Sequence, residues 1–435
     1  MSIFRHRLEF GKYVPLIRKR YRKESRICIL LRGVDYHKNK GLSKGLEYIE
    51  DKHGGYGMYC LGCMKEIDDS QKECPFCGFR KEEYLKTVSG RALPLETILI
   101  GRYLIGKVLG EGGFGITYLA YDLQTDTPVA IKEYFPSGFA GRNSTTDHHL
   151  EVSQGKMYEY YEKGLRDFEK EARILARLQE IEGIVSVKSF FHENKTAYMV
   201  MEYIHGISLK EYVVKRGKPL SEKGCLFLMR PIMKALSQVH KEGIIHRDIS
   251  PDNIIIQKRG KTVLLDFGSA RQSLGEETKS LTVLLKHGYA PVEQYQSQGK
   301  QGPYTDVYAL CATMYWMVSG QKPVEAIERL VQDTLVPLKG ECTRGEKLAV
   351  SNGFSDIVAK GMAVKREERY QSVSEVLRDI NKLSKEKITE EEVEKQFVNP
   401  MSAEENKTID WNIWELSFVF VLLVLVAIAG DVFLQ

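Results

Sequence analysis

The sequence is poor in cysteine and proline, and it carries no strong excess of charge of either sign. Its 435 residues include 8 Cys, 13 Pro and 37 Gly, with a formal net charge of +5. So low a cysteine content excludes a scaffold built from disulfides, and the modest proline and glycine content excludes a low-complexity chain. A net charge of +5 is too small to indicate nucleic-acid binding by itself.

Long hydrophobic stretches are also scarce. The mean hydropathy of −0.30 excludes a polytopic membrane protein, although it leaves room for one membrane span. Hydrophobic residues make up 43% and charged residues 28% of the chain, which is typical of a globular protein. The length is enough for two or three domains of roughly 150 residues each.

The basic residues are concentrated at the N-terminus. Residues 1–57 contain 14 Lys/Arg and 6 Asp/Glu, a net of +8, so the remainder carries 5 − 8 = −3. This extension is either an arm that contacts anionic lipid or nucleic acid, or a poorly ordered solvated segment. A third hypothesis is that translation starts at Met58, because the codons of Gly54 and Gly55 can form a purine-rich ribosome-binding site.

One apolar run lies near the C-terminus. Residues 416–430 are apolar apart from Ser417, and the run extends to Leu434. These 19 residues correspond to about 28 Å of helix, enough to cross a bilayer. Trp411 and Trp414 precede the run, where interfacial aromatics belong. We expect a transmembrane helix at 411–435 in the cell membrane, a charged juxtamembrane linker at 381–410 and a cytoplasmic location for everything before it. A buried core helix is the alternative.

Four cysteines form a regular pattern. Two Cys-x2-Cys pairs, separated by ten residues, lie at Cys60, Cys63, Cys74 and Cys77. Two such knuckles supply the four thiolates of a structural zinc site, and Gly78 permits the tight turn behind the second pair. We predict a zinc ribbon at 58–82, with a redox pair or disulfides as alternatives. Its charges are balanced, so it favours a protein partner over nucleic acid.

The other cysteines show no such spacing. Cys28, Cys225, Cys311 and Cys342 are expected to be ordinary buried thiols.

A glycine-rich loop follows. A strand predicted at 103–110 leads into Gly110-Glu-Gly-Gly-Phe-Gly115, and a second strand follows at 116–121. A dinucleotide site would need a helix after the third glycine. Because a strand follows here, we predict a hairpin whose backbone can approach phosphate groups.

Charged residues with complementary chemistry follow in order. Lys132 ends the strand-like run Val-Ala-Ile-Lys, and Glu171 lies on a helical stretch at 168–175. The segment His-Arg-Asp248 and Asn253 come next, followed by Asp266-Phe-Gly. A lysine paired with a glutamate, together with two carboxylates and an amide on neighbouring loops, suits phosphate binding, proton acceptance and two Mg²⁺ contacts.

Taken together, these motifs resemble the eukaryotic-like (Hanks-type) serine/threonine protein kinases over residues 102–380. An APE-like element ending at Glu293 and the pair Thr305-Asp306 extend the resemblance. The ribbon and the single span resemble bacterial membrane-anchored members. The resemblance implies an α+β bilobal kinase fold, with a β-rich N-lobe and a helical C-lobe, that uses ATP and Mg²⁺.

The resemblance also implies roles for single residues. Lys132 orients the α/β-phosphates, Glu171 holds Lys132, and Asp248 is the catalytic base. Asn253 and Asp266 bind Mg²⁺. The implied ATP-binding residues are Leu109, Gly110, Glu111, Gly112, Gly113, Phe114, Gly115, Ala130, Lys132, Met201, Glu202 and Ile204. Structural roles are implied for a Glu293–Arg369 pair and for Asp306 as the anchor of the catalytic loop.

Three departures from the family pattern stand out. Ser250 replaces the lysine expected two positions after Asp248, and Lys286 lies near the place of a threonine expected before the APE-like element. The connection between Lys132 and Glu171 is long, and its polar, tyrosine-rich stretch 143–164 is interpreted as a lid or docking surface.

We therefore expect a membrane-tethered, ATP-dependent protein serine/threonine kinase that acts on protein hydroxyls and on itself. Candidate autophosphorylation sites are Thr278, Ser280 and Thr282, where Arg247 can receive the phosphate. A pseudokinase scaffold that binds nucleotide without phosphoryl transfer is the alternative, favoured only by Ser250. A zinc-ribbon nucleic-acid adaptor is a third hypothesis, disfavoured by the charge pattern outside 1–57.

Overall fold

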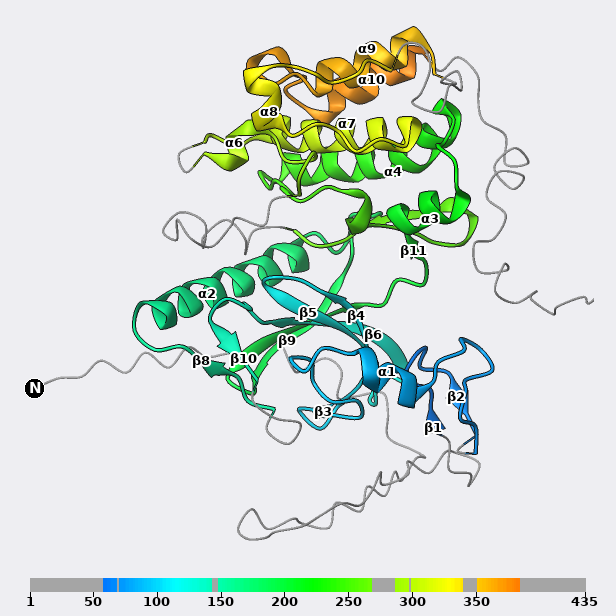
Figure 1. The fold of residues 1–435 in the computed structure, drawn as a ribbon, viewed down its shortest axis with the longest axis vertical. Coiled ribbons are helices and arrows are strands. Elements are labelled where there is room, and N and C mark those ends of the chain that lie inside the picture. The colour runs from blue at the N-terminus through cyan, green and yellow to red at the C-terminus, as the bar shows by residue number, and fades with distance from the viewer. Residues whose placement is uncertain are drawn as a thin grey trace, which may run out of the picture. The chain divides into compact units, whose positions relative to one another are not determined.

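The structure is a computed structural model that describes residues 58–68, 70–142, 148–267, 286–296, 299–338 and 350–383. All of these lie in one compact unit, Glu50–Gln435 (Figure 1). The basic extension 1–57, the predicted phosphorylation sites, residues 384–410 of the predicted linker and the predicted membrane span fall outside the described residues. Residues 381–383, the first of the predicted linker, are the last residues of helix α10 (Val373–Leu383). Within the described part of the chain, no helix is both long enough and apolar enough to cross a bilayer.

The N-lobe is an antiparallel sheet of six strands in the order β3-β4-β5-β6-β10-β9. Alternating apolar and β-branched residues bury one or both faces of these strands. Lys132 on β6 lies opposite Thr117 on β5 and Met199 on β10. The strands are β3 (Ile98–Leu99), β4 (Tyr103–Glu111), β5 (Gly115–Asp122), β6 (Thr127–Tyr134), β9 (Val187–Glu193) and β10 (Thr196–Glu202).

One long helix, α2 (Lys156–Arg177), packs against β9 and β10 of this sheet. Its buried residues Tyr161, Phe168, Glu171 and Leu175 recur at helical spacing and form one face. Residues 156–164 form the first turns of α2 and are therefore not a loop-like lid, whereas the interpretation of 143–164 as a docking surface stays a prediction. Residues 143–147 lie outside the description, and a small ribbon of β7 (Ala140–Gly141) and β8 (Glu151–Val152) flanks them.

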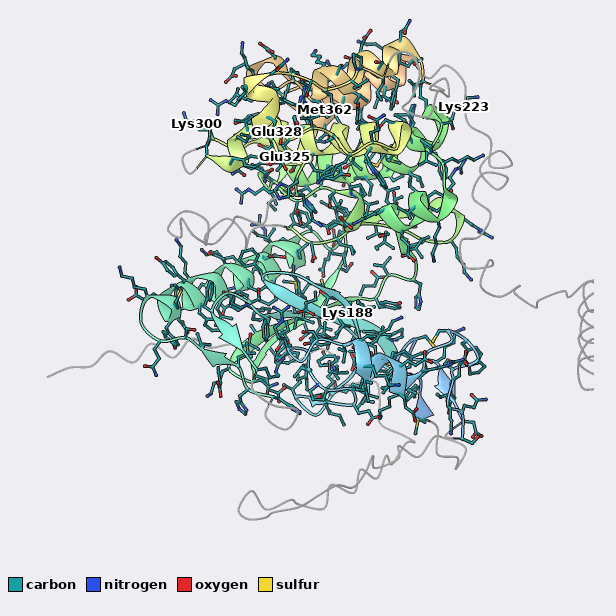
Figure 2. All side chains as sticks on the ribbon, viewed as in Figure 1. Lys188, Lys223, Lys300, Glu325, Glu328 and Met362 are labelled. Carbon is teal, nitrogen blue, oxygen red and sulfur yellow. The ribbon has the colours of Figure 1, made fainter. Side chains whose placement is uncertain are left out.

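The C-lobe is built around two helices, α4 (Glu222–Lys241) and α7 (Pro303–Ser319). Almost every residue of α7 is buried, as expected for a helix enclosed on all sides. The sticks in Figure 2 show side chains filling the space between these helices and their neighbours. Among the described residues of the C-lobe, the other helices are α3 (Leu209–Arg216), α6 (Val292–Tyr295), α8 (Ala326–Val331), α9 (Asn352–Gly361) and α10 (Val373–Leu383).

Short elements carry the loops of the C-lobe. A three-stranded sheet joins β11 (Ile207–Ser208), β12 (Ile254–Ile256) and β13 (Thr262–Leu264). The turns η1 (Pro251–Asn253), η2 (Lys258–Gly260) and η3 (Arg366–Glu368) are 3₁₀ helices. The expected bilobal fold, with a sheet in the N-lobe and helices in the C-lobe, is confirmed.

Ahead of the N-lobe lies a small module formed by a hairpin, β1 (Met58–Tyr59) with β2 (Glu66–Ile67), and by helix α1 (Lys81–Thr87). The helix has no buried residue, and the strands are two residues long each. A segment this small has little core of its own.

Candidate active site

The glycine-rich loop is the turn between β4 and β5, as the sequence predicts. Gly112 N–H donates to the Gly115 carbonyl (2.9 Å), which closes the turn. At Gly115 a Cβ atom would lie 2.6 Å from the carbonyl oxygen of Glu133, so only glycine allows this approach. The loop therefore leaves its backbone close to β6, the strand that carries Lys132.

Lys132 is shared by two carboxylates. Its Nζ lies 3.1 Å from Glu171 Oε1 on α2 and 3.0 Å from Asp266 Oδ1 beyond β13. Burial lowers the pKa of Lys132, but the two carboxylates outweigh it and hold the pKa above its ordinary range. The ammonium group therefore remains charged, and it joins the N-lobe helix to the C-lobe.

The strand β10 leads into the segment between the lobes. Met201 lies opposite Ala130 of β6, and both side chains are buried. Glu202 N–H donates to the Ser186 carbonyl (2.9 Å), and Ile204 follows the end of the strand. The structure thus places four of the predicted ATP-binding residues, Ala130, Met201, Glu202 and Ile204, on β6, on β10 and just after it.

The catalytic-loop residues Asp248 and Asn253 are in direct contact. Asn253 Nδ2 donates to Asp248 Oδ2 (2.7 Å) and to the Asp248 carbonyl (2.8 Å). Both residues are buried, and Asn253 ends the turn η1. The amide thereby fixes the orientation of the Asp248 carboxylate.

A neutral histidine supports this loop. His246 is fully buried; its Nε2 lies 2.8 Å from the Leu265 carbonyl, and its Nδ1 accepts from Asp248 N–H (3.2 Å). These partners require a neutral ring with the proton on Nε2. Burial agrees with this, because it lowers the pKa of His246 despite the neighbouring carboxylates.

Asp306 anchors the backbone of the catalytic loop, as the resemblance implies. Its Oδ2 accepts from His246 N–H and its Oδ1 from Arg247 N–H, each at 2.8 Å. Arg247 has a φ of +70°, a conformation that a side chain disfavours and that these bonds stabilise. A third partner, His240 Nε2 at 2.7 Å from Asp306 Oδ2, was not predicted, because no motif marks it in the sequence.

Asp266 also has a left-handed backbone, with a φ of +44°. The next residue, Phe267, is buried, and its ring lies 4.5 Å from the ring of His246 between centroids. The two motifs that carry Asp248 and Asp266 are thus packed together through His246 and Phe267.

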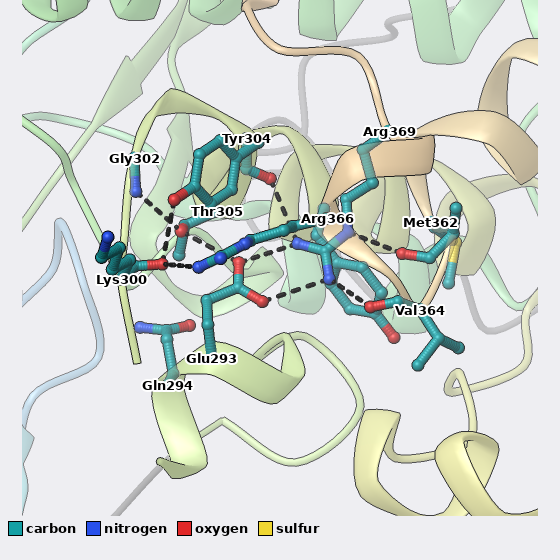
Figure 3. A network of polar contacts seen from close by, with 12 residues as sticks. Glu293, Gln294, Lys300, Gly302, Tyr304, Thr305, Met362, Val364, Arg366 and Arg369 are labelled. Atoms are coloured by element: carbon teal, nitrogen blue, oxygen red, sulfur yellow. Dashed lines mark hydrogen bonds and ion pairs between the residues drawn. The ribbon is translucent and has the colours of Figure 1, made fainter. Parts of the chain in front are cut away.

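The predicted Glu293–Arg369 pair is present and fully enclosed (Figure 3). Arg369 donates from Nη1 and Nη2 to the two oxygens of Glu293 (2.8 and 3.1 Å). Glu293 also accepts from Thr305 Oγ1 (3.0 Å), while Arg369 reaches the carbonyls of Ala363 and Val364. This network ties the segment before α7 to the end of the C-lobe.

Ser250 occupies the position where the family pattern predicts a lysine. Ser250 is 0% exposed, and its hydroxyl has no hydrogen-bond partner among the described residues. Two lysines contact the carboxylate of Asp252, another residue of the catalytic loop. Lys210 Nζ lies 3.0 Å and Lys286 Nζ 3.2 Å from its oxygens.

The four cysteines converge, as their spacing predicts. Their Sγ atoms all lie within 4.8 Å of one another, with Cys60 and Cys77 3.6 Å apart and Cys63 and Cys74 3.8 Å apart. Four sulfurs at about 2.3 Å from a tetrahedral zinc would be about 3.8 Å apart, whereas a disulfide bond is about 2.0 Å long. The donor set and its geometry therefore fit zinc.

Local backbone geometry also fits a metal knuckle. Gly62 N–H donates to Cys60 Sγ (3.3 Å), and Gly78 adopts the φ of +67° that its predicted turn requires. Burial raises the pKa of the Cys60 thiol to about 11, so a cation is what would hold it as a thiolate. Cys225 and Cys311 are ordinary buried thiols in the C-lobe, as predicted.

Sequence reasoning missed a buried cluster next to Lys132. Glu133 is buried on the opposite face of β6 and accepts from Arg142 and from the hydroxyls of Tyr118 (2.7 Å) and Tyr198 (2.9 Å). The alternation of a strand is a signal for it, since Lys132 and Glu133 must face opposite sides. The cluster holds the start of the long connection to α2.

A family model described as "Protein kinase domain" matches residues 103–380, which is more than half of the chain. The chain belongs to the protein kinase family. The match runs from the start of β4 to α10, so the four-cysteine module of this kinase lies ahead of the family's domain.

Two curated bacterial proteins are similar to this kinase. Serine/threonine-protein kinase F of Synechocystis sp. is 32% identical over 317 residues, which cover 68% of this chain and 59% of that protein. Serine/threonine-protein kinase PrkC of Bacillus subtilis is 31% identical over 283 residues, covering 64% and 40%. The chain thus spans about half the length of these relatives.

A solved structure is similar as well. The structure titled "PpkA-294 apo form" has 36% sequence identity and a TM-score of 0.60, and the match covers 67% of this chain and 99% of that one. The likeness extends over both lobes and supports the assignment of the fold.

Proposed function

We propose that this kinase transfers the γ-phosphate of ATP to serine and threonine hydroxyls of proteins. The observation that carries the proposal is the position of Lys132, whose ammonium group contacts Glu171 and Asp266 at once. That arrangement brings a phosphate-binding cation of the N-lobe to the carboxylate of the C-lobe.

Proton transfer in this proposal involves Asp248. The substrate hydroxyl donates its hydrogen bond to the Asp248 carboxylate, whose orientation is fixed by Asn253 (2.7 Å). As the oxygen attacks the γ-phosphorus and ADP leaves, Asp248 takes the proton. Lys132 binds the α/β-phosphates. Asn253 and Asp266 would hold Mg²⁺, which neutralises phosphate charge in this chemistry.

The test is phosphoryl transfer by the full chain. We expect label from γ-labelled ATP on the chain or on casein in the presence of Mg²⁺. Asp248→Asn keeps nearly the same shape but cannot accept the proton, so it should lower the rate by about 10²- to 10⁴-fold. Equal labelling by the wild-type chain and by Asp248→Asn would contradict the proposal.

A pseudokinase that binds nucleotide without transfer is the second candidate, and Ser250 favours it. The buried hydroxyl supplies no positive charge to the γ-phosphate. If the wild-type chain labels neither itself nor casein, yet ATP raises the midpoint of its thermal unfolding, this second candidate is correct.

We also propose that Cys60, Cys63, Cys74 and Cys77 hold a structural zinc ion. The tetrahedral spacing of the four sulfurs supports this. Atomic emission of the purified chain should detect about one zinc per chain, and the double variant Cys60→Ser/Cys63→Ser should lack it. A module stabilised in this way can also offer a surface to a protein partner.

Two further proposals rest on the sequence. The apolar run 416–434 supports tethering to the cell membrane, with the kinase domain cytoplasmic; fractionation of cells with and without residues 411–435 tests it. Autophosphorylation at Thr278, Ser280 or Thr282 is supported by Arg247, whose buried Nε has no partner among the described residues. Phosphosite mapping tests it.

A further inference from the structure

The four-cysteine module covers the outer edge of the strand that carries the glycine-rich loop. β3 pairs with β4 at Tyr103 and Leu104, and Ile105 exchanges backbone hydrogen bonds with Glu96 and Thr97 just ahead of β3. Beyond these residues, the backbone N–H of Lys107 donates to the carbonyl of Leu61 (2.8 Å), and that of Val108 donates to the hydroxyl of Tyr84 (2.8 Å). The strand leading to the loop is therefore held from outside by the module.

Both donors lie at an irregularity in β4. The register with β5 shifts between Ile105 and Val108 and again between Val108 and Gly110. In a regular strand, consecutive N–H groups point to opposite edges, so a bulge is needed for Lys107 and Val108 to donate to the same side. The module binds the strand where its pairing with the sheet is interrupted, two residues before the loop begins.

Each of these contacts leads back to the cysteines within a few residues. Leu61 lies between Cys60 and Cys63, so its carbonyl belongs to the first knuckle. The ring of Tyr84 contacts the ring of Phe79, with centroids 5.5 Å apart. Phe79 in turn packs against Gly62 of the first knuckle so closely that a Cβ on Gly62 would lie 2.4 Å from the Phe79 side chain. The orientation of the Tyr84 hydroxyl thus depends on the packing of both knuckles.

Side chains reinforce the contact. Met64, next to the first knuckle, lies so close to Gly106 of β4 that a Cβ there would be 2.3 Å from the Met64 methyl group. Met64 is buried with Leu104, Leu119 and Tyr121 in a small cluster separate from the main core. The module therefore shares a hydrophobic core with the N-lobe.

The same cluster reaches the segment that follows β10. Tyr203, located between Glu202 and Ile204, packs against it, as does Tyr59 of β1, whose ring stacks on Tyr121 at 4.2 Å. Farther along the chain, Arg91 forms an ion pair with Glu111 at the start of the glycine-rich loop. The module and the residues after it contact both the glycine-rich loop and the segment after β10, the two segments that the family resemblance assigns to ATP.

From these contacts we propose that the metal-loaded module is a positioning element for the nucleotide site. Its folding requires the metal, because it has almost no core of its own. Loaded, it fixes β4 and Tyr203 in the arrangement that binds ATP; when the metal is removed or the thiols are oxidised, these contacts are lost and ATP affinity falls. The proposal rests on the proposed function only in assigning the nucleotide to this site.

The first experiment measures ATP affinity with and without the metal. The full chain is treated with a chelator that binds Zn²⁺ far more tightly than Mg²⁺, and binding of Mg·ATP is followed by calorimetry. We expect at least about tenfold weaker binding after removal and recovery when Zn²⁺ is added back. Unchanged affinity in zinc-depleted protein would overturn the proposal.

A point variant keeps the test decisive if zinc removal unfolds the N-lobe. Tyr84→Phe removes only the hydroxyl that accepts from Val108 N–H, and it should raise the KM for ATP by about two- to tenfold, the effect of one hydrogen bond, with kcat little changed. Tyr370→Phe, which removes a hydroxyl bonded to Asp379 in the C-lobe (2.9 Å), is the matched control. Equal KM values in the two variants would contradict the positioning role.

The outcomes also separate this proposal from the proposed function. A chain that binds ATP in a zinc-dependent manner but transfers no phosphate supports the positioning role and refutes the kinase activity. A chain that phosphorylates equally well with and without zinc does the reverse.

Discussion

Lys132 and Arg369 are both buried cations held by carboxylates, but the two clusters are built differently. Arg369 is 0% and Glu293 5% exposed, and the guanidinium donates to both carboxylate oxygens and to three backbone carbonyls. Lys132 is 17% exposed and divides its donors between Glu171, 1% exposed, and Asp266, 30% exposed.

The difference separates a structural ion pair from a functional one. A planar guanidinium with a bidentate partner has its geometry fixed and no donor left for a ligand. An ammonium group shared by carboxylates from two lobes can exchange a partner for a phosphate oxygen at low cost. The Arg369 cluster is closed to ligands, as a structural ion pair requires, and the Lys132 cluster is open to a phosphate, as a binding site requires.

The largest effect should come from breaking the closed cluster. Arg369→Met leaves the Glu293 carboxylate buried without its charged partner, and we expect the free energy of unfolding to fall by about 3–5 kcal/mol. Urea unfolding measures this. Lys382→Met, which breaks an exposed ion pair with Asp379 on α10, is the control and should cause no resolvable change. Similar losses in both variants would mean that the buried cluster is not special.

Breaking the open cluster should instead affect catalysis. Lys132→Met removes a preorganised positive charge, and we expect the rate of phosphoryl transfer to fall by about 10²- to 10³-fold. Initial rates with saturating Mg·ATP measure it. Lys188→Met, an exposed lysine on β9 of the same sheet (Figure 2), should keep its activity. A variant at Lys132 that unfolds as readily as the one at Arg369 would remove the distinction between the clusters.

A smaller effect is expected from pH, through His246. Burial holds its folded-state pKa below the ordinary value of about 6.5, so the unfolded chain takes up a proton first as the pH falls. The contribution to stability is complete above the unfolded pKa, and it is lost between that value and the lower folded one. Urea unfolding from pH 8 to pH 5 should show this decline.

One variant assigns the decline to this ring. His246→Phe should make the pH profile flatter, because a phenyl ring takes up no proton. A profile that keeps its slope in His246→Phe would place the titrating group elsewhere.

Motif chemistry made much of the site predictable. Lys132, Glu171, Asp248 and Asp266 each belong to a short pattern, and their partners follow from charge. The cluster of Glu133, Arg142 and two tyrosines was missed, because its members come from three strands and the residue after β7, and only tertiary packing brings them together. The docking of the cysteine module was missed for the same reason. Leu61 takes part through its backbone carbonyl, and Gly106 leaves room for Met64 because it has no side chain, so no side-chain motif marks either residue.

The smallest expected effect concerns Ser250. It tests whether the Lys132 cluster needs the Ser250 hydroxyl for phosphoryl transfer. Its buried hydroxyl lacks a partner among the described residues, so Ser250→Ala removes a desolvated group and no hydrogen bond. The free energy of unfolding should change by less than about 1 kcal/mol or rise, whereas Ser319→Ala, which loses a bond to the Tyr315 carbonyl (2.8 Å), should lower it. Phosphoryl transfer by Ser250→Ala at the wild-type rate would mean that Lys132 and the Mg²⁺ ligands suffice without this hydroxyl. A large loss of the phosphoryl-transfer rate would instead show that the Ser250 hydroxyl takes part in the reaction, so that Lys132 and the Mg²⁺ ligands alone would not account for activity.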